Sequence, residues 1–165
     1  MPLIVEDGTG VTNANSLCSV AFADAYFAER GITSWAGDSA TVKGPALIRA
    51  TDYIEARFGL RFKGSKSEDD QALSWPRDDV DILPIPISKA TAEYALRALT
   101  QTLAPDPVID PSNRLVYIDA SKVGPISESK TYAKDFAAPM TFRPYPAADA
   151  LLKPYLVSTS GVVRA

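Results

Sequence analysis

The positions of the prolines divide this sequence into two parts. Of its 13 prolines, 11 lie from Pro76 onward, and eight of those fall between Pro105 and Pro154. Proline has no backbone N–H to donate and disrupts the interior of a helix. The chain before Pro76 can therefore be helical, whereas the last third is restricted to short strands, turns and extended chain.

The composition indicates a folded protein without obvious catalytic chemistry. Hydrophobic residues make up 46% and charged residues 22% of the 165 residues, close to the average for globular domains. The chain has no histidine, so it lacks the commonest general base and metal ligand. Its net charge of −3 argues against binding dominated by phosphate neutralisation. We therefore expect a protein that is not an enzyme and has no cofactor and no bound metal.

Cysteine use and the start of the chain predict where the protein resides. Cys18 is the only cysteine, which fits a reducing compartment. Residues 1–7 lack the basic and apolar regions of a signal peptide, and no apolar run approaches the roughly 20 residues of a membrane span. We expect a soluble, cytoplasmic protein with no membrane partner.

Apolar spacing and capping residues predict three main helices and a shorter fourth. The first helix is expected over Val20–Arg30, with Ser19 as its N-cap. The second is expected over Pro45–Phe58 and the third over Ser88–Leu103, separated by a long connection. A short helix is expected at Ala147–Lys153.

The β-prone run Leu115–Ala120 predicts one strand, and a turn at Val123–Ile126 leads to a second at Ile126–Ala133. The predicted fold is mainly α, a small helical bundle of about three to four helices with a β-hairpin and an extended proline-rich C-terminal arm. Its predicted parts are a helical body (1–104), a linker with the hairpin (105–138) and the arm (139–165).

Two local patterns resemble ligand sites but favour simpler interpretations. Gly8-Thr9-Gly10 lacks the third glycine and the strand–helix context of a phosphate loop, so we interpret it as a turn. The acidic clusters fit no EF-hand spacing and are interpreted as a solvated loop; they comprise Glu68, Asp69, Asp70, Asp78, Asp79 and Asp81.

A basic section of the long connection offers a candidate for nucleic-acid binding. Four cations are interleaved with Phe58 and Phe62, a combination that can hold single-stranded nucleic acid by charge and stacking. In the simpler alternative, the two phenylalanines enter the core and the cations stay solvated beside an opposing acidic section. The four candidate cations are Arg57, Arg61, Lys63 and Lys66.

Five stretches of the sequence together resemble a known family. They are Ile4–Ser16, Ala25–Gly31, Ala46–Ile54, Gln71–Arg77 and Ile85–Leu99. The chain resembles a family encoded in tailed-phage structural gene clusters and labelled DnaT-like single-stranded-DNA-binding protein. The family is similar in size and layout to head–tail connector (adaptor) proteins of the phage neck.

What the resemblance implies is a virion structural protein. A homo-oligomeric ring, of twelve subunits, would join the portal protein to a tail, stopper or terminator protein and continue the channel for passing double-stranded DNA without gripping it. Such a protein would reside in the host cytoplasm during assembly and then in the virion. The alternative is a single-stranded-DNA-binding protein that assists phage replication.

The adaptor interpretation assigns two further groups of residues. The apolar residues of the arm, which are too scattered by proline to build a separate core, are candidates for portal docking: Met140, Phe142, Tyr145, Leu151, Leu152, Tyr155, Leu156, Val162 and Val163. Charged residues on the second and third predicted helices are candidates for contacts between subunits: Arg49, Asp52, Glu55, Glu93 and Arg97.

Overall fold

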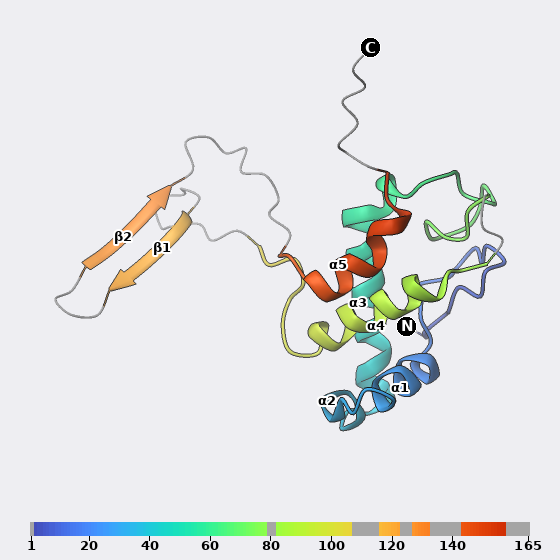
Figure 1. Cartoon of the computed structure of the whole chain (residues 1–165), viewed down its shortest axis with the longest axis horizontal. Helices are drawn as coiled ribbons and strands as arrows, with labels where there is room; N and C mark the ends of the chain where they lie inside the picture. The colour runs from blue at the N-terminus through green and yellow to red at the C-terminus, as the bar shows by residue number, and fades with distance from the viewer. Residues whose placement is uncertain (1, 79–81, 107–115, 123–126, 133–142, 158–165) are drawn as a thin grey trace, which may run out of the picture. The chain divides into compact units, whose positions relative to one another are not determined.

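The structure, a computed structural model, describes residues 2–78, 82–106, 116–122, 127–132 and 143–157, with backbone alone for 116–122 and 127–132. The chain forms two units, shown in Figure 1. The first contains residues 1–103 and 144–165, and the second contains residues 104–143. The chain thus leaves the first unit once and returns to it.

The first unit is helical, which confirms the mainly α prediction. The described residues contain five α-helices rather than three to four. Two short 3₁₀ helices, η1 (Gly59–Arg61) and η2 (Lys153–Tyr155), follow α3 and α5. The α-helices are α1 (Val20–Ala28), α2 (Thr33–Ala36), α3 (Ala40–Phe58), α4 (Ile85–Ala98) and α5 (Pro146–Leu152). Within the described part of the chain, no helix is both long and apolar enough to span a bilayer.

The start of α1 is as predicted, and α2 was missed. The Ser19 side chain accepts a hydrogen bond from the Phe22 backbone N–H at 3.1 Å, as expected of an N-cap. Helix α2 has four residues, too few to display a helical period in the sequence. It buries Trp35 against Phe27, with ring centroids 5.2 Å apart.

The two longest helices start earlier than predicted. Helix α3 begins at Ala40 and contains Pro45 one turn inside, where its ring is exposed. Helix α4 begins at Ile85, before the expected Ser88, because Pro86 is accommodated in the first turn, where no N–H is needed. It ends at Ala98 rather than Leu103.

The core lies where α3, α4 and α5 pack together. Leu47 and Ile54 of α3, Ile87 of α4 and Leu152 of α5 are completely buried. In Figure 1, α5 lies alongside α4, and the two helices contact each other closely. The last described helix therefore completes the core of the first unit.

This packing corrects the prediction of an extended C-terminal arm for residues 144–157. Helix α5 and η2 occupy most of that segment, and Tyr145, Ala148 and Leu152 are buried. Pro146 starts the helix and Pro154 lies in η2, so the prolines flank the helical residues rather than preventing a helix. Residues 139–142 and 158–165 of the predicted arm lie outside the described residues.

In the second unit, two strands pair antiparallel. Strand β1 (Val116–Lys122) lies against β2 (Ser127–Tyr132), with an irregularity between Val116 and Ile118. The predicted turn at 123–126 lies outside the described residues. The β-hairpin as a whole therefore stays a prediction.

Candidate nucleic-acid interface

Two segments far apart in the sequence meet at one edge of the first unit. Residues 61–63 run antiparallel to residues 155–157, with a single bridge between Phe62 and Leu156. The Lys63 N–H donates to the Tyr155 carbonyl at 2.9 Å, and the Val157 N–H donates to the Arg61 carbonyl at 2.8 Å. We call residues 60–63 with 153–157 the paired edge. Through these backbone hydrogen bonds Lys63 and Tyr155 are neighbours across the pairing, as are Arg61 and Val157.

The buried side chain of Arg77 holds the backbone of this edge through hydrogen bonds. Its guanidinium donates to the carbonyls of Phe62, Lys63, Gly64 and Ser74 at 2.6 to 3.2 Å. The residue is only 8% exposed, and burial lowers the pKa of its guanidinium. A planar group with five donors can satisfy several converging carbonyls at once. The position of Lys63 is therefore set by a buried arginine.

Four cations on and beside the paired edge are exposed: Arg61, Lys63, Lys66 and Lys153. None of them forms an ion pair with a carboxylate of the described residues. The Lys63 ammonium donates to the Pro154 carbonyl at 2.8 Å, and the Lys66 ammonium donates to the Gln71 carbonyl at 3.2 Å. Each ammonium has three donors, so both can still contact an anion.

Arg57, the remaining predicted cation, has a different role. It forms a bidentate ion pair with Asp149 of α5, with nitrogen–oxygen distances of 3.0 and 3.1 Å. Burial lowers the pKa of Arg57, but the Asp149 carboxylate together with Tyr53 and Tyr94 raises that pKa overall. The same carboxylate accepts from the Tyr94 hydroxyl, and burial followed by this hydrogen bond raises the pKa of Tyr94. Arg57 is therefore part of the contact that holds α5.

The aromatic residues of the predicted basic section are not available at the surface. Phe58 and Phe62 are each 3% exposed, as the simpler alternative expected. Phe62 packs edge-on against Trp75, with centroids 5.5 Å apart, and Trp75 packs edge-on against Tyr155 at 5.7 Å. Of these rings, Tyr155 alone is partly exposed. The paired edge therefore offers a tyrosine in place of the predicted phenylalanines.

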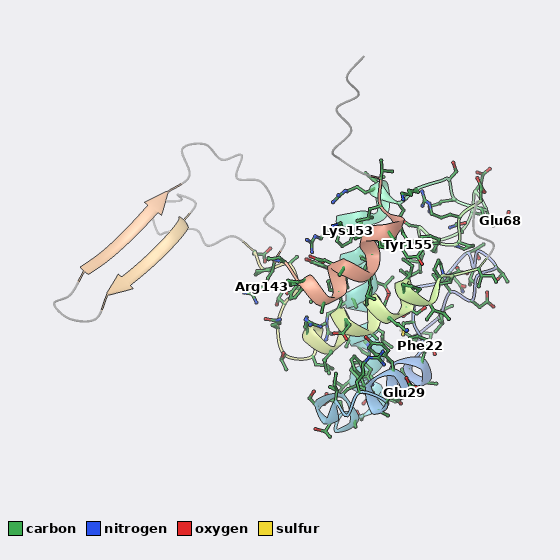
Figure 2. The ribbon with its side chains drawn as sticks, viewed as in Figure 1. Phe22, Glu29, Glu68, Arg143, Lys153 and Tyr155 are labelled. Atoms are coloured by element: carbon green, nitrogen blue, oxygen red, sulfur yellow. The ribbon has the colours of Figure 1, made fainter. Side chains whose placement is uncertain are left out.

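Apolar and acidic side chains frame the cations. Leu60 is fully exposed and Val157 is 53% exposed, and both lie at the end of the paired edge where Val157 pairs with Arg61. The exposed acidic residues Glu68, Asp69 and Asp70 belong to the following loop. Figure 2 shows Glu68 well to one side of Lys153 and Tyr155, which lie close together. The acidic cluster thus borders the cations at one end.

The other candidate ligand sites are filled by the protein itself or lack the needed groups. The buried Glu6 carboxylate accepts from the backbone N–H groups of Gly8, Gly10 and Val11 at 2.8 to 3.0 Å. These are the donors that a phosphate loop would present, so the turn interpretation is confirmed. Within the described residues, no group of three or more acidic, cysteine or histidine side chains is arranged to hold a metal.

Most of the predicted subunit-contact residues make contacts within the chain. Glu93 and Arg97 form an ion pair at 2.8 Å, and Glu93 also accepts from the Tyr26 hydroxyl at 2.9 Å. Arg49 donates to the Ala98 carbonyl, and Glu55 accepts from Ser74. Asp52 is exposed. The predicted set is therefore not one free surface.

The predicted portal-docking residues differ in burial, and some of them lie outside the described residues. Tyr145 and Leu152 are buried in the core, so they do not contribute the exposed apolar surface on which the prediction was based. Leu151, Tyr155 and Leu156 are half-buried. Met140, Phe142, Val162 and Val163 lie outside the described residues.

Sequence reasoning missed Leu60 and Lys153 as interface candidates and gave Tyr155 a different role. Lys153 and Tyr155 lie about 90 residues from the basic section, and only the backbone pairing of residues 61–63 with 155–157 brings the two together. The Lys153-Pro154-Tyr155 sequence combines a cation and an aromatic residue, and this combination was the sequence signal that could have indicated a nucleic-acid-binding segment.

Comparison with known proteins gives one match. The chain has no significant match among curated proteins and none among solved structures. A family model described as "Putative DnaT-like ssDNA binding protein" matches residues 1–165. The match covers the whole chain, including both segments of the paired edge. The protein therefore belongs to this DnaT-like family.

Proposed function

We propose that this protein binds single-stranded DNA, without catalysing a reaction, through Arg61, Lys63, Lys66 and Lys153. The observation that carries the proposal is this group of exposed cations, contributed by two distant segments and free of carboxylate partners in the described residues. The description of the family supports the same class of ligand.

The charge of the molecule determines what kind of binding is expected. Phosphates of a DNA strand are neutralised by nearby lysine and arginine side chains, with release of counterions. Because the whole chain carries a net charge of −3, attraction is local to the cation group and weakens steeply with added salt. We therefore expect moderate, salt-sensitive affinity.

Fluorescence anisotropy with a labelled thymidine oligonucleotide tests this proposal over a range of salt concentrations. The variant Arg61→Gln/Lys153→Gln is expected to bind more weakly and to lower the salt slope by about 1.4, because each phosphate contact on a single strand contributes about 0.7. The matched control Arg30→Gln/Lys89→Gln removes two positive charges elsewhere and is expected to retain the wild-type slope. Equal effects of the two double variants, or no binding by the wild type, would contradict the proposal.

A second candidate function is the head–tail adaptor implied by the sequence resemblance. The observation in its favour is the division into a helical unit and a separate unit of residues 104–143, a layout that leaves one part of the chain available for neighbouring subunits. We propose that such an adaptor forms a homo-oligomeric ring bound to a portal protein. Mass photometry distinguishes the two functions: a closed ring without DNA favours the adaptor, and a monomer that binds the oligonucleotide favours the first proposal.

A further inference from the structure

We propose that Tyr155 is the base-stacking residue of this interface, and that it makes the site selective for unpaired bases over duplex DNA. This inference rests on the proposed single-stranded-DNA binding and names how the strand is recognised. It assigns to one aromatic ring a role that the cations cannot supply, because charge alone does not distinguish single strands from duplexes.

The ring of Tyr155 is supported from behind by two buried rings. Trp75, which is 2% exposed, lies edge-on to Tyr155, and Phe62, which is 3% exposed, lies edge-on to Trp75. Edge-to-face contacts of this kind favour one relative orientation of the rings. Tyr155 is thus the outermost member of an ordered row of three and the one that is partly exposed.

The backbone on both sides of Tyr155 is also fixed. Its carbonyl accepts a hydrogen bond from the Lys63 N–H, and the next residue, Leu156, forms the bridge with Phe62. Arg77 holds the opposite segment through the carbonyls of Phe62 and Lys63. A stacking side chain that is already ordered loses little conformational entropy when a base binds.

Cations flank this ring from both segments. Lys63 is its cross-strand neighbour, with its ammonium held at the Pro154 carbonyl, and Lys153 lies two residues before it. Figure 2 shows Lys153 and Tyr155 next to each other on the first unit. A partly exposed aromatic ring with lysines nearby matches what proteins use to hold unpaired bases and their phosphates together.

The arrangement predicts selectivity because only unpaired bases can reach the ring. In a duplex, both faces of each base are already stacked on neighbours, and flipping one out costs a few kcal/mol. Tyr155 projects from a paired backbone segment of the first unit and not from an elongated element that would enter a groove. The cations would contact either kind of DNA, so the difference in affinity is expected to come from Tyr155.

Binding to two labelled oligonucleotides of about 20 nucleotides, longer than a typical single site, and to a labelled duplex of the same length tests the proposal. One is a thymidine strand and the other is an abasic strand with the same phosphates and no bases. Wild-type protein is expected to bind the thymidine strand about tenfold more tightly than the abasic strand, the effect of one stacked base. Tyr155→Leu is expected to abolish that difference, whereas Tyr155→Phe and Tyr155→Trp are expected to keep it.

Two further readouts separate stacking from a purely structural role. The salt slope is expected to be unchanged in Tyr155→Leu and reduced in Lys153→Gln, because only the latter removes a phosphate contact. Thermal unfolding of each variant shows whether the first unit stays folded. Should Tyr155→Leu unfold, the folded variants Tyr155→Phe and Tyr155→Trp still report on stacking, because the larger indole ring is expected to strengthen base-dependent binding and the phenyl ring to retain it.

The outcomes distinguish this inference from the function on which it rests. If wild-type protein binds the thymidine and abasic strands equally, or binds duplex as tightly as single strands, the stacking role is wrong and the charge-based function stands. If it binds none of these, both are wrong. If Tyr155→Leu loses affinity equally for the thymidine and abasic strands, Tyr155 supports the fold of the interface and is not a stacking residue.

Discussion

Arg77 shows how strongly one residue can determine local structure through hydrogen bonds to backbone carbonyls. Its guanidinium replaces water for four backbone carbonyls of the loop between α3 and α4. A lysine has the same charge but cannot reach several converging carbonyls with a planar fork. The identity of this residue, and not its charge, is what the loop requires.

Arg77→Lys is therefore expected to lower the free energy of unfolding by about 2 kcal/mol, because buried carbonyls lose their donors. Urea denaturation followed by tryptophan fluorescence measures this change. Arg61→Lys makes the same substitution at an exposed position and is expected to change stability by no more than about 0.5 kcal/mol. Similar midpoints for the two variants would show that the carbonyl contacts of Arg77 contribute little.

Residue-scale prediction from the sequence succeeded for local features and failed for distant ones. The Ser19 cap and the Gly8–Gly10 turn depend on neighbours within a few positions, and both were predicted. The pairing of Lys63 with Tyr155 depends on a chain reversal about 90 residues later. No local pattern encodes that pairing, so Tyr155 was assigned to a docking arm and was not linked to the basic section.

At the scale of elements, Asp24 joins three helices through a single carboxylate. Its Oδ1 accepts from the Trp35 indole of α2 at 2.7 Å and from the Lys43 ammonium of α3 at 2.9 Å. Lys43 is 7% exposed, so its ammonium is largely buried beside this carboxylate. The hydrogen bond from Lys43, partly opposed by burial, lowers the pKa of Asp24.

A lowered pKa in the folded state means that Asp24 stabilises the protein above its ordinary pKa of about 4, and that this contribution is lost as pH falls below it. Asp24→Asn is expected to be less stable than wild type at pH 7 by about 1 kcal/mol, since the carboxylate is partly solvated. The difference is expected to shrink as pH falls below about 4. Thermal melts across this range measure it, with Asp38→Asn as the control. A difference independent of pH would exclude the charge as its cause.

Asp149 attaches helix α5 to both long helices through polar contacts. The carboxylate accepts hydrogen bonds from Arg57 of α3 and from the Tyr94 hydroxyl of α4. It also accepts one, at 3.3 Å, from the Tyr145 backbone N–H at the start of its own helix. One side chain thus caps α5 and links it to both long helices. Its negative charge in the first turn is also favourable to the helix dipole.

Asp149→Ala is expected to lower the free energy of unfolding by about 3 kcal/mol, because it leaves the Arg57 charge largely buried without its partner. Limited proteolysis is expected to cut the variant first within residues 144–157. Asp69→Ala removes an exposed carboxylate and serves as the control. If both variants unfold at the same urea concentration, α5 is held by its apolar face alone.

The sequence indicated the existence of most helices better than their ends. The periods of α1, α3 and α4 were visible in the sequence, whereas α2 is too short to have one. Two prolines misled the prediction of helix starts: Pro45 lies inside α3 and Pro86 inside α4, and both helices begin earlier than predicted. A helix can contain proline where the displaced hydrogen bond is near its start or faces solvent.

For the whole molecule, the two-unit division follows from where the chain leaves and re-enters the first unit. The Tyr145 hydroxyl donates to the Leu103 carbonyl at 3.3 Å, and both residues are 5% exposed. The two ends of the second unit are therefore anchored close together. Helix α5 belongs to the first unit, together with the helices that precede residue 104.

Replacing residues 104–143 with a short glycine–serine linker is expected to leave the first unit folded, because the linker has only a short distance to span. A truncation after Ala138 is expected to cost on the order of 5 kcal/mol, since it removes the buried Tyr145, Ala148 and Leu152. Circular dichroism and thermal melts distinguish the two. A stable truncated protein together with an unfolded linker variant would reverse this assignment.

The contact between Arg57 and Asp149 spans 92 positions in the chain, which has a consequence for synthesis. A ribosome releases α3 and α4 well before α5, because translation adds roughly 5 to 20 residues per second. During that interval the surface that will bury Ala148 and Leu152 is open to water, and sequence-distant contacts of this kind form slowly. The nascent chain is then a natural substrate for holding chaperones, and its first unit matures only after α5 has been translated.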